Sequence, residues 1–240
     1  MIMKHQLTVL FEDNHILAVE KPPGMLTQGD RTGDLCMVDQ AKAYLKEKYH
    51  KPGDVYLGLV HRLDRPTGGV LLLARTSKAA KRLSEQFRRR TVQKFYLAAC
   101  RGVPERARGE CTHYLRFDSE RRKSMVSKRP KEGFQEAVLR YSLLDVRAGD
   151  SLLEVQLLTG RKHQIRAQLS ALGLPILRDR KYTPGDRGRG VVKEFGLWAH
   201  RLSCDHPVAK GRLEICSVPS PTRHPLWSEF AESLSSLPAG

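Results

Sequence analysis

The stretch HRLDRPTGGVLLLAR, from His61 to Arg75, joins a charged turn to an apolar run. Asp64 lies between Arg62 and Arg65, and the proline and glycines that follow favour a turn, because proline fixes φ and glycine tolerates left-handed backbone. The run VLLLA at 70–74 has the composition of a strand buried on both faces. We therefore predict an acidic side chain on a loop that a rigid core strand holds in place, as is common for functional groups.

The carboxyl group of Asp64 has two possible roles. Flanking arginines lower the pKa of a carboxyl group and keep it ionised, as a nucleophile or a base requires. Alternatively, Asp64 is a surface acid that pairs with Arg62 or Arg65 and has no further role. The local sequence is compatible with both, so other segments of the chain must decide between them.

The charge balance indicates a polyanionic partner. The chain has 240 residues, with 42 Lys and Arg against 26 Asp and Glu, a net charge of +16 and a pI near 9.9. Such an excess attracts nucleic acid or an acidic membrane surface. The longest apolar run, at 70–74, is far shorter than the roughly 20 residues of a spanning helix, so we expect no membrane segment.

The cysteines indicate a reducing compartment. The chain has five cysteines, scattered without a C-x-x-C pair: Cys36, Cys100, Cys111, Cys204 and Cys216. An odd number without a pairing pattern argues against a disulfide framework, and we predict a cytoplasmic protein. Cys204 and His206 have no second ligand pair nearby, so we predict no metal site.

Hydrophobic patterning predicts more strands than helices. The expected strands lie at 7–11, 16–20, 70–74, 92–99, 152–158 and 212–218. The expected helices lie at 37–49, 77–90, within 159–173, and around Trp227, Phe230 and Leu234. Residues 101–135 are expected to form a solvated hairpin or loop, and residues 178–193 a mobile basic loop. Because strands and helices do not alternate regularly, the predicted class is α+β with a mixed or mostly antiparallel sheet in one compact domain.

Two segments outside the opening stretch offer further functional side chains. On the strand at 92–99, Lys94 and Tyr96 share one face. A tyrosine facing a basic groove can stack on a base, although a lone tyrosine is more often a core residue with a bonded hydroxyl. In TGRKHQIRAQL at 159–169, His163 and Arg166 are neighbours on a helix surface.

Arg166 lies beside the apolar stripe of its helix, where a half-buried guanidinium needs an anion. Asp64 or a phosphate could supply that anion, and the alternative is a surface arginine whose stem packs on apolar neighbours. Basic clusters at 88–90, 121–131 and 178–193, taken with the net charge, favour nucleic acid as the partner.

Five segments together resemble the RluA-like family of RNA pseudouridine synthases. They are FEDNHILAVEKPPGMLTQ (11–28), HRLDRPTGGVLLLAR (61–75), QKFYLA (93–98), LLTGRKHQIRAQLSALGLPILRDRKY (157–182) and WAHRLSCDHPV (198–208). Their order and approximate spacing match the family from about residue 9 to residue 220. The resemblance implies a mixed, mostly antiparallel bent sheet with flanking helices and a central catalytic cleft.

The resemblance also implies roles for individual residues. Asp64 corresponds to the catalytic aspartate, Arg166 to the arginine that pairs with it, and Tyr96 to the tyrosine that packs against the target base. Arg62 corresponds to the arginine that reaches into the RNA, and we expect further RNA contacts from Arg65, Lys94 and His163. No metal or organic cofactor is implied.

The expected protein is thus an isomerase that converts uridine to pseudouridine in structured RNA, either rRNA or tRNA. We expect residues 1–240 to form a single catalytic domain without a separate N-terminal RNA-binding domain, and we expect a monomer. The alternative is a catalytically silent RNA-binding or ribosome-assembly factor with the same fold. A DNA-binding protein is disfavoured, because no helix-turn-helix, zinc-finger or zipper pattern is present.

Two local departures from the family pattern affect turns. Relatives usually carry Thr-Ser-Gly after the aspartate, where this chain has Thr67-Gly68-Gly69, which could alter the stiffness of the turn. Relatives also usually carry Gly-Asp where this chain has Arg178-Asp179, which leaves the local turn open.

Overall fold

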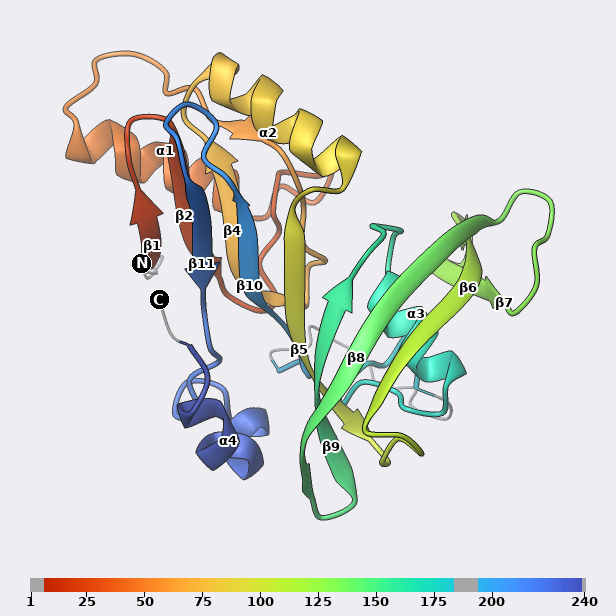
Figure 1. The fold of residues 1–240 in the computed structure, drawn as a ribbon. Helices are drawn as coiled ribbons and strands as arrows, with labels where there is room; N and C mark the ends of the chain where they lie inside the picture. Colours follow the sequence, from red (N-terminus) through yellow and green to blue (C-terminus); the bar gives the residue numbers. More distant parts are fainter. Residues whose placement is uncertain (1–6, 184–193, 239–240) are drawn as a thin grey trace.

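The computed structural model describes residues 7–183 and 194–238, which fold around a single large sheet (Figure 1). Its strands are β1 (Val9–Glu12), β2 (Ile16–Lys21), β3 (Gly58–Leu59), β4 (Gly68–Ala74), β5 (Gln93–Arg101), β6 (Arg108–Asp118), β7 (Lys123–Ser127), β8 (Gln135–Arg147), β9 (Asp150–Leu157), β10 (Leu197–Asp205) and β11 (Arg212–Cys216). The helices are α1 (Met37–Lys48), α2 (Ser77–Arg89), α3 (Gln164–Ala171), the 3-10 helix η1 (Pro225–Phe230) and α4 (Ala231–Ser235).

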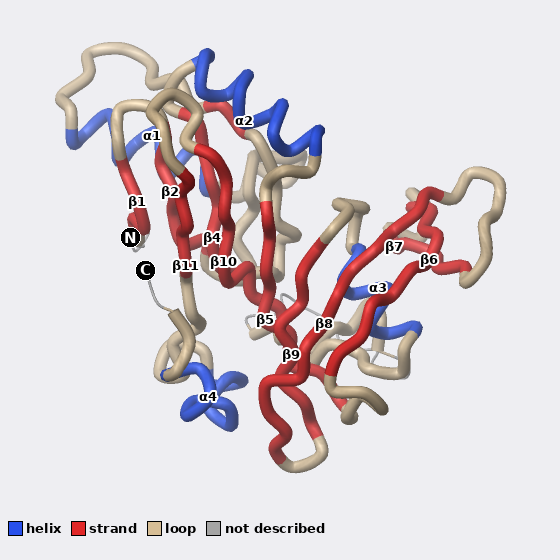
Figure 2. The backbone as a smooth tube through the Cα atoms, viewed as in Figure 1, coloured by secondary structure: helices blue, strands red, loops and turns tan. Residues whose placement is uncertain are grey.

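The sheet is mixed but mostly antiparallel. Among the described residues its order is β1-β2-β4-β10-β5-β9-β8-β6-β7, with β11 paired to β10 and β3 to β4. Of the strand pairs within residues 7–183 and 194–238, only β4 with β10 is parallel. Figure 2 shows the strands continuing through two halves that splay apart, with α1 and α2 beside the first half and α3 beside the second. The predicted α+β class with a mixed, mostly antiparallel sheet is therefore confirmed.

The first half of the sheet is sandwiched between two helices. Val70, Leu72 and Ala74 of β4 pack with Ala79 and Leu83 of α2. The alternate residues Leu71 and Leu73 pack on the other face with Met37, Ala41 and Leu45 of α1. All seven residues of β4 are buried, which confirms the prediction of a strand covered on both faces. The loop that carries Asp64 thus leads directly into a strand that is buried along its whole length.

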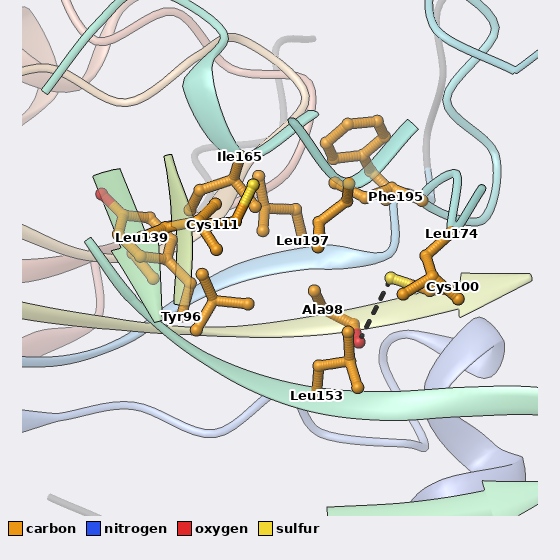
Figure 3. Packing of buried hydrophobic residues seen from close by; sticks show 14 of the residues in the cluster. Tyr96, Ala98, Cys100, Cys111, Leu139, Leu153, Ile165, Leu174, Phe195 and Leu197 are labelled. Atoms are coloured by element: carbon orange, nitrogen blue, oxygen red, sulfur yellow. Dashed lines mark hydrogen bonds between the residues drawn. The ribbon is translucent and has the colours of Figure 1, made fainter. Parts of the chain in front are cut away.

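The second half is built around β5, β8 and β9. Tyr96 and Ala98 of β5 pack with Leu153 of β9 and with Ile165 and Leu169 of α3 in one apolar cluster, seen from close by in Figure 3. On the opposite face, the C-terminal helices η1 and α4 cover β5 and β10 through Trp227, Phe230 and Leu234. This packing holds α3, and the side chains at its start, over the cleft-facing side of the sheet.

The two glycines after Thr67 allow β4 and β10 to approach closely. Gly69 has φ +105°, and a β-carbon there would overlap the backbone of Ala199 in β10. A β-carbon at Gly68 would overlap the ring of Trp198. The departure at position 68 therefore matches this chain's own packing, because the indole of Trp198 fills the space that a side chain at Gly68 would need.

The sequence analysis predicted less β structure between residues 101 and 147 than the fold contains. Residues 101–135 contain the predicted hairpin, but β6 within it has 11 residues and buries Cys111, His113 and Leu115. Strand β8 was not predicted at all. Only 178–183 of the predicted mobile loop 178–193 can be assessed, since 184–193 lie outside the described residues. None of the five cysteines forms a disulfide, and all five are buried.

Arg178 adopts a left-handed backbone conformation, with φ +64°. A side chain at such a position costs about 1 kcal/mol, which glycine avoids. We expect Arg178→Gly to stabilise the fold by about 1 kcal/mol in urea unfolding, without a change in the m-value. Arg178→Ala removes the same charge but keeps the β-carbon, so it should give no such gain. Equal effects of the two variants would contradict the argument from backbone strain.

Candidate active site

The loop that carries Asp64 is fixed on both sides of that residue. The Thr27 hydroxyl donates to the carbonyl oxygen of Leu63 (2.9 Å) and accepts from the Leu63 N–H (3.2 Å). The N–H of Thr67 donates to the carbonyl oxygen of Asp64 (3.0 Å) and closes the turn. The backbone of Asp64 therefore has little freedom, and its side chain projects from a fixed point.

Lys21, at the end of β2, also holds the Asp64 loop in place through hydrogen bonds. Its Nζ donates to the carbonyl oxygens of Met25 (2.7 Å), Arg65 (3.0 Å) and Pro22 (3.1 Å). Its side chain is fully buried, and burial lowers the pKa of Lys21 to about 7. A buried ammonium group that bonds three carbonyls ties the 21–25 turn to the Asp64 loop.

Arg166 brings the anion of Asp64 into contact with the second half of the fold. Its Nη1 donates to Asp64 Oδ2 (3.0 Å), while its Nε and Nη2 both donate to Asp179 (2.8 Å each). Only 5% of Arg166 and 1% of Asp179 are exposed. The predicted pairing of Arg166 with Asp64 is confirmed by this geometry, and Asp64 pairs with neither of its flanking arginines.

Tyr96 and His163 complete the surroundings of Asp64. Burial, together with the negative charge of Asp64, raises the pKa of Tyr96, so its phenol stays protonated. The ring of Tyr96 belongs to the apolar cluster around α3, and the residue also lines the cleft that holds Asp64. His163 Nε2 lies 3.7 Å from Asp64 Oδ2.

The other predicted contact residues differ in their surroundings. Arg62 is exposed and makes no hydrogen bond or ion pair to any described residue. The guanidinium of Arg65 already has partners within the protein, because its Nε donates to the Gly24 carbonyl (2.9 Å) and its Nη2 lies 2.8 Å from Asp34. Lys94 shares the cleft-facing side of β5 with Tyr96, as its position in the strand predicted.

One cleft of about 1340 Å³ is lined by every residue predicted for the site: Arg62, Asp64, Arg65, Lys94, Tyr96, His163 and Arg166. Small-molecule pockets typically measure roughly 300–1,000 Å³, so this cleft suits a larger ligand. Its described lining contains three aspartates and the following twelve cations: Arg62, Arg65, Arg88, Arg90, Lys94, Arg122, Arg161, Lys162, Arg166, Arg178, Arg180 and Lys181. Members of all three predicted basic clusters thus converge on Asp64, as the binding of a polyanion requires.

Three residues of the site were missed by the sequence analysis. Asp179 holds Arg166, Lys21 holds the Asp64 loop, and Tyr182 contacts His163. A signal for Asp179 was present in the sequence, because the guanidinium of a half-buried arginine has five N–H donors and can bond two carboxylates. Nothing in the local sequence indicates that Lys21 is buried.

We expect Asp179→Asn to destabilise the fold by about 3 kcal/mol, because it leaves the buried guanidinium of Arg166 with half of its counter-charge. Denaturant unfolding of the full chain measures this loss. The control is Glu154→Gln, which breaks the partly exposed ion pair of Glu154 with Arg201 (3.5 Å) and should cost less than about 1 kcal/mol. Equal losses would show that burial of the Arg166 pair has no special weight.

Comparison with known proteins identifies the family of this chain. The profile of the RNA pseudouridylate synthase family matches residues 15–171. The chain is 33% identical over 213 residues to ribosomal large subunit pseudouridine synthase C of Buchnera aphidicola, covering 86% of this chain and 65% of that protein. It is 29% identical to tRNA pseudouridine synthase C of Haemophilus ducreyi, covering 94% of this chain and 96% of that protein.

A solved structure gives the same result for the fold. Human RNA pseudouridylate synthase domain containing 4 superposes with a TM-score of 0.75 at 26% identity, over 97% of this chain and 95% of that one. The chain spans about two thirds of the Buchnera relative and nearly all of the Haemophilus relative. The family profile covers more than half of the sequence and includes both Asp64 and Arg166. The chain therefore belongs to the RNA pseudouridylate synthase family of isomerases.

Proposed function

We propose that this protein isomerises specific uridines in structured RNA to pseudouridine, with Asp64, Tyr96 and Arg166 as its catalytic residues. The observation that supports this most directly is the Asp64 carboxylate, paired with a buried guanidinium 3.0 Å away in a cleft lined by cations. The relatives named above act on ribosomal RNA or tRNA, and either class suits this cleft.

The chemistry requires an ionised acid beside the ribose. The N-glycosidic bond of uridine breaks, the uracil turns without leaving, and its C5 joins the sugar. Bond breaking builds positive character on the sugar, which a carboxylate can stabilise or attack. Asp64 could equally remove a sugar proton as a base. In each route the hydrogen bond from Arg166 Nη1 orients the Asp64 carboxylate.

The remaining residues handle the base and the RNA chain. A uridine in structured RNA must leave its stack first, at a cost of a few kcal/mol. The exposed guanidinium of Arg62 can fill the vacated place and offset part of that cost. The ring of Tyr96 retains the freed uracil by stacking. Arg65, Lys94 and His163 are the further residues that we predict to contact RNA.

The wider setting of the protein follows from the same features. We propose that it works in the cytoplasm, since its five cysteines are unpaired. We propose further that it is a monomer, since its sequence carries no heptad pattern that would favour a partner helix. No helix among residues 7–183 and 194–238 combines the length and apolar character that crossing a membrane requires.

Asp64→Asn should abolish the activity, with a loss of at least roughly 1,000-fold in kcat, because the amide cannot act as nucleophile or base. RNA from a strain that lacks the protein is incubated with wild type or variant, and pseudouridine is then mapped. Wild type should restore one or a few sites, and the variant none. The silent-factor alternative predicts instead that neither protein modifies RNA and that Asp64→Asn rescues the deletion phenotype.

Lys94 gives a pH-dependent test of RNA binding. It is half-buried in the cleft without a hydrogen bond or ion pair to any described residue, and a β-carbon at Gly160 would lie 3.7 Å from its Nζ. Burial, with a smaller contribution from the charge of Arg90, lowers the pKa of Lys94 to about 8. A phosphate bound to the ammonium would therefore be lost as the amine deprotonates above pH 8.

We expect the Kd for an RNA stem-loop that contains a mapped site to rise about tenfold between pH 7 and pH 9, since a pH one unit above the pKa leaves about a tenth of the amine charged. Filter binding measures the change. Lys94→Arg keeps its charge at both pH values and should bind almost equally. A parallel loss in wild type and Lys94→Arg would exclude Lys94 as the titrating contact.

A further inference from the structure

His163 occupies an unusual backbone position beside Asp64. It is the residue before α3 and has φ +55° and ψ +24°, in the left-handed region that residues other than glycine rarely adopt. Its side chain is 9% exposed, and its Nε2 faces Asp64 Oδ2 at 3.7 Å. The left-handed conformation aims the imidazole at the carboxylate, although it costs energy that an ordinary helix start would avoid.

The other ring nitrogen of His163 is held by Tyr182. The N–H of Ser124, in β7, donates to the phenol oxygen of Tyr182 (2.6 Å). Burial raises the pKa of Tyr182, so the phenol keeps its proton and has it available to donate. His163 Nδ1 lies 3.0 Å from that oxygen and can accept it. The proton of a neutral imidazole then lies on Nε2, which points at Asp64.

The carboxylate side of the contact requires the same arrangement. A bare Nε2 lone pair facing the negative Oδ2 would be repelled, whereas an Nε2–H is attracted. Both ends of the ring thus favour one tautomer. The Ser124 hydroxyl also donates to the carbonyl oxygen of Lys162 (2.5 Å), which fixes the backbone just before His163.

We propose that His163 is a positioning residue that donates a second hydrogen bond to Asp64 Oδ2 when RNA binds, and that Tyr182 sets the tautomer it needs. This inference rests on the proposed function. Arg166 Nη1 already donates to Oδ2, and Oδ1 has no hydrogen bond or ion pair among the described residues. Two donors on Oδ2 therefore leave Oδ1 as the oxygen that meets the ribose. The distance of 3.7 Å shortens on binding, as hydrogen bonds in ligand-free active sites commonly do.

Burial and the surrounding positive charges keep the imidazole of His163 neutral. Asp64 attracts a proton to it, but burial and the positive charges of Arg166, Lys181 and Lys162 act against protonation. Together they lower the pKa of His163 to about 4. The only other ring against it within the described residues, besides Tyr182, is the uncharged Phe117. The contact with Asp64 is thus that of a neutral imidazole donor at neutral pH.

Two substitutions at position 163 separate donation from a structural role. His163→Gln can place its amide N–H near the former Nε2, whereas the shorter amide of His163→Asn reaches only the former Nδ1. Asparagine tolerates left-handed backbone better than glutamine, so a purely structural role predicts that His163→Asn is the better variant. The proposal predicts the reverse.

We expect His163→Asn to lower kcat roughly 10- to 100-fold with little change in KM, and His163→Gln to be clearly less impaired. A rise in KM at unchanged kcat would instead make His163 an RNA contact. Better activity of His163→Asn than of His163→Gln would also overturn the proposal.

A second measurement does not depend on catalysis. In protein labelled with ¹⁵N-histidine, the ring resonances of His163 should show the proton on Nε2 in wild type and a mixture of tautomers in Tyr182→Phe. Observation of the proton on Nδ1 in wild type would overturn the proposal even in an active enzyme. If wild type shows the Nε2 proton but converts no uridine, the proposed function fails while the tautomer assignment stands.

Discussion

Arg166 carries a positive charge to a place where almost no water reaches it, and its geometry follows from how that charge is balanced. Asp179 binds the Nε and Nη2 edge of the guanidinium, so that only Nη1 is directed toward Asp64. A bidentate contact of this kind fixes the plane of the guanidinium as well as its position. Asp64 therefore meets a donor of fixed direction, which a lysine at the same place could not provide.

This ion network joins parts of the chain that the fold brings together from opposite halves of the sheet. Asp64 precedes β4 in the first half, while Arg166 lies in the first turn of α3 in the second half, 102 residues later. The packing of Ile165 and Leu169 against β5 and β9 sets the position of α3 on the sheet. The pairing of β4 with β10 sets the position of the Asp64 loop. The position of the Asp64 carboxylate relative to Arg166 thus depends on how the two halves of the sheet are arranged.

Much of this fold could be predicted from the sequence, because buried elements carry strong periodicity. The apolar run in β4 and the stripes of α2 and α3 identified those elements correctly. Strand β8 was missed for a physical reason. Its outer face is polar and finds its partners across the sheet, as in the Arg140–Glu110 ion pair with β6 (2.8 Å), and its register shifts between Leu143 and Asp145. A solvated strand with an irregular register resembles a loop when the sequence is read alone.

The site shows the same division between what a sequence states and what only packing decides. An arginine beside an apolar stripe needs an anion, and that requirement made Asp64 one candidate partner of Arg166, the one that the family resemblance also implied. The requirement does not say how many anions there are. Asp179 stands in the basic segment RDRKY, with three cationic residues as its neighbours in the sequence. The left-handed turn at Arg178 instead directs Asp179 inward, away from those neighbours and onto Arg166. A buried charge therefore reveals that partners exist, but the backbone conformation selects which carboxylates they are.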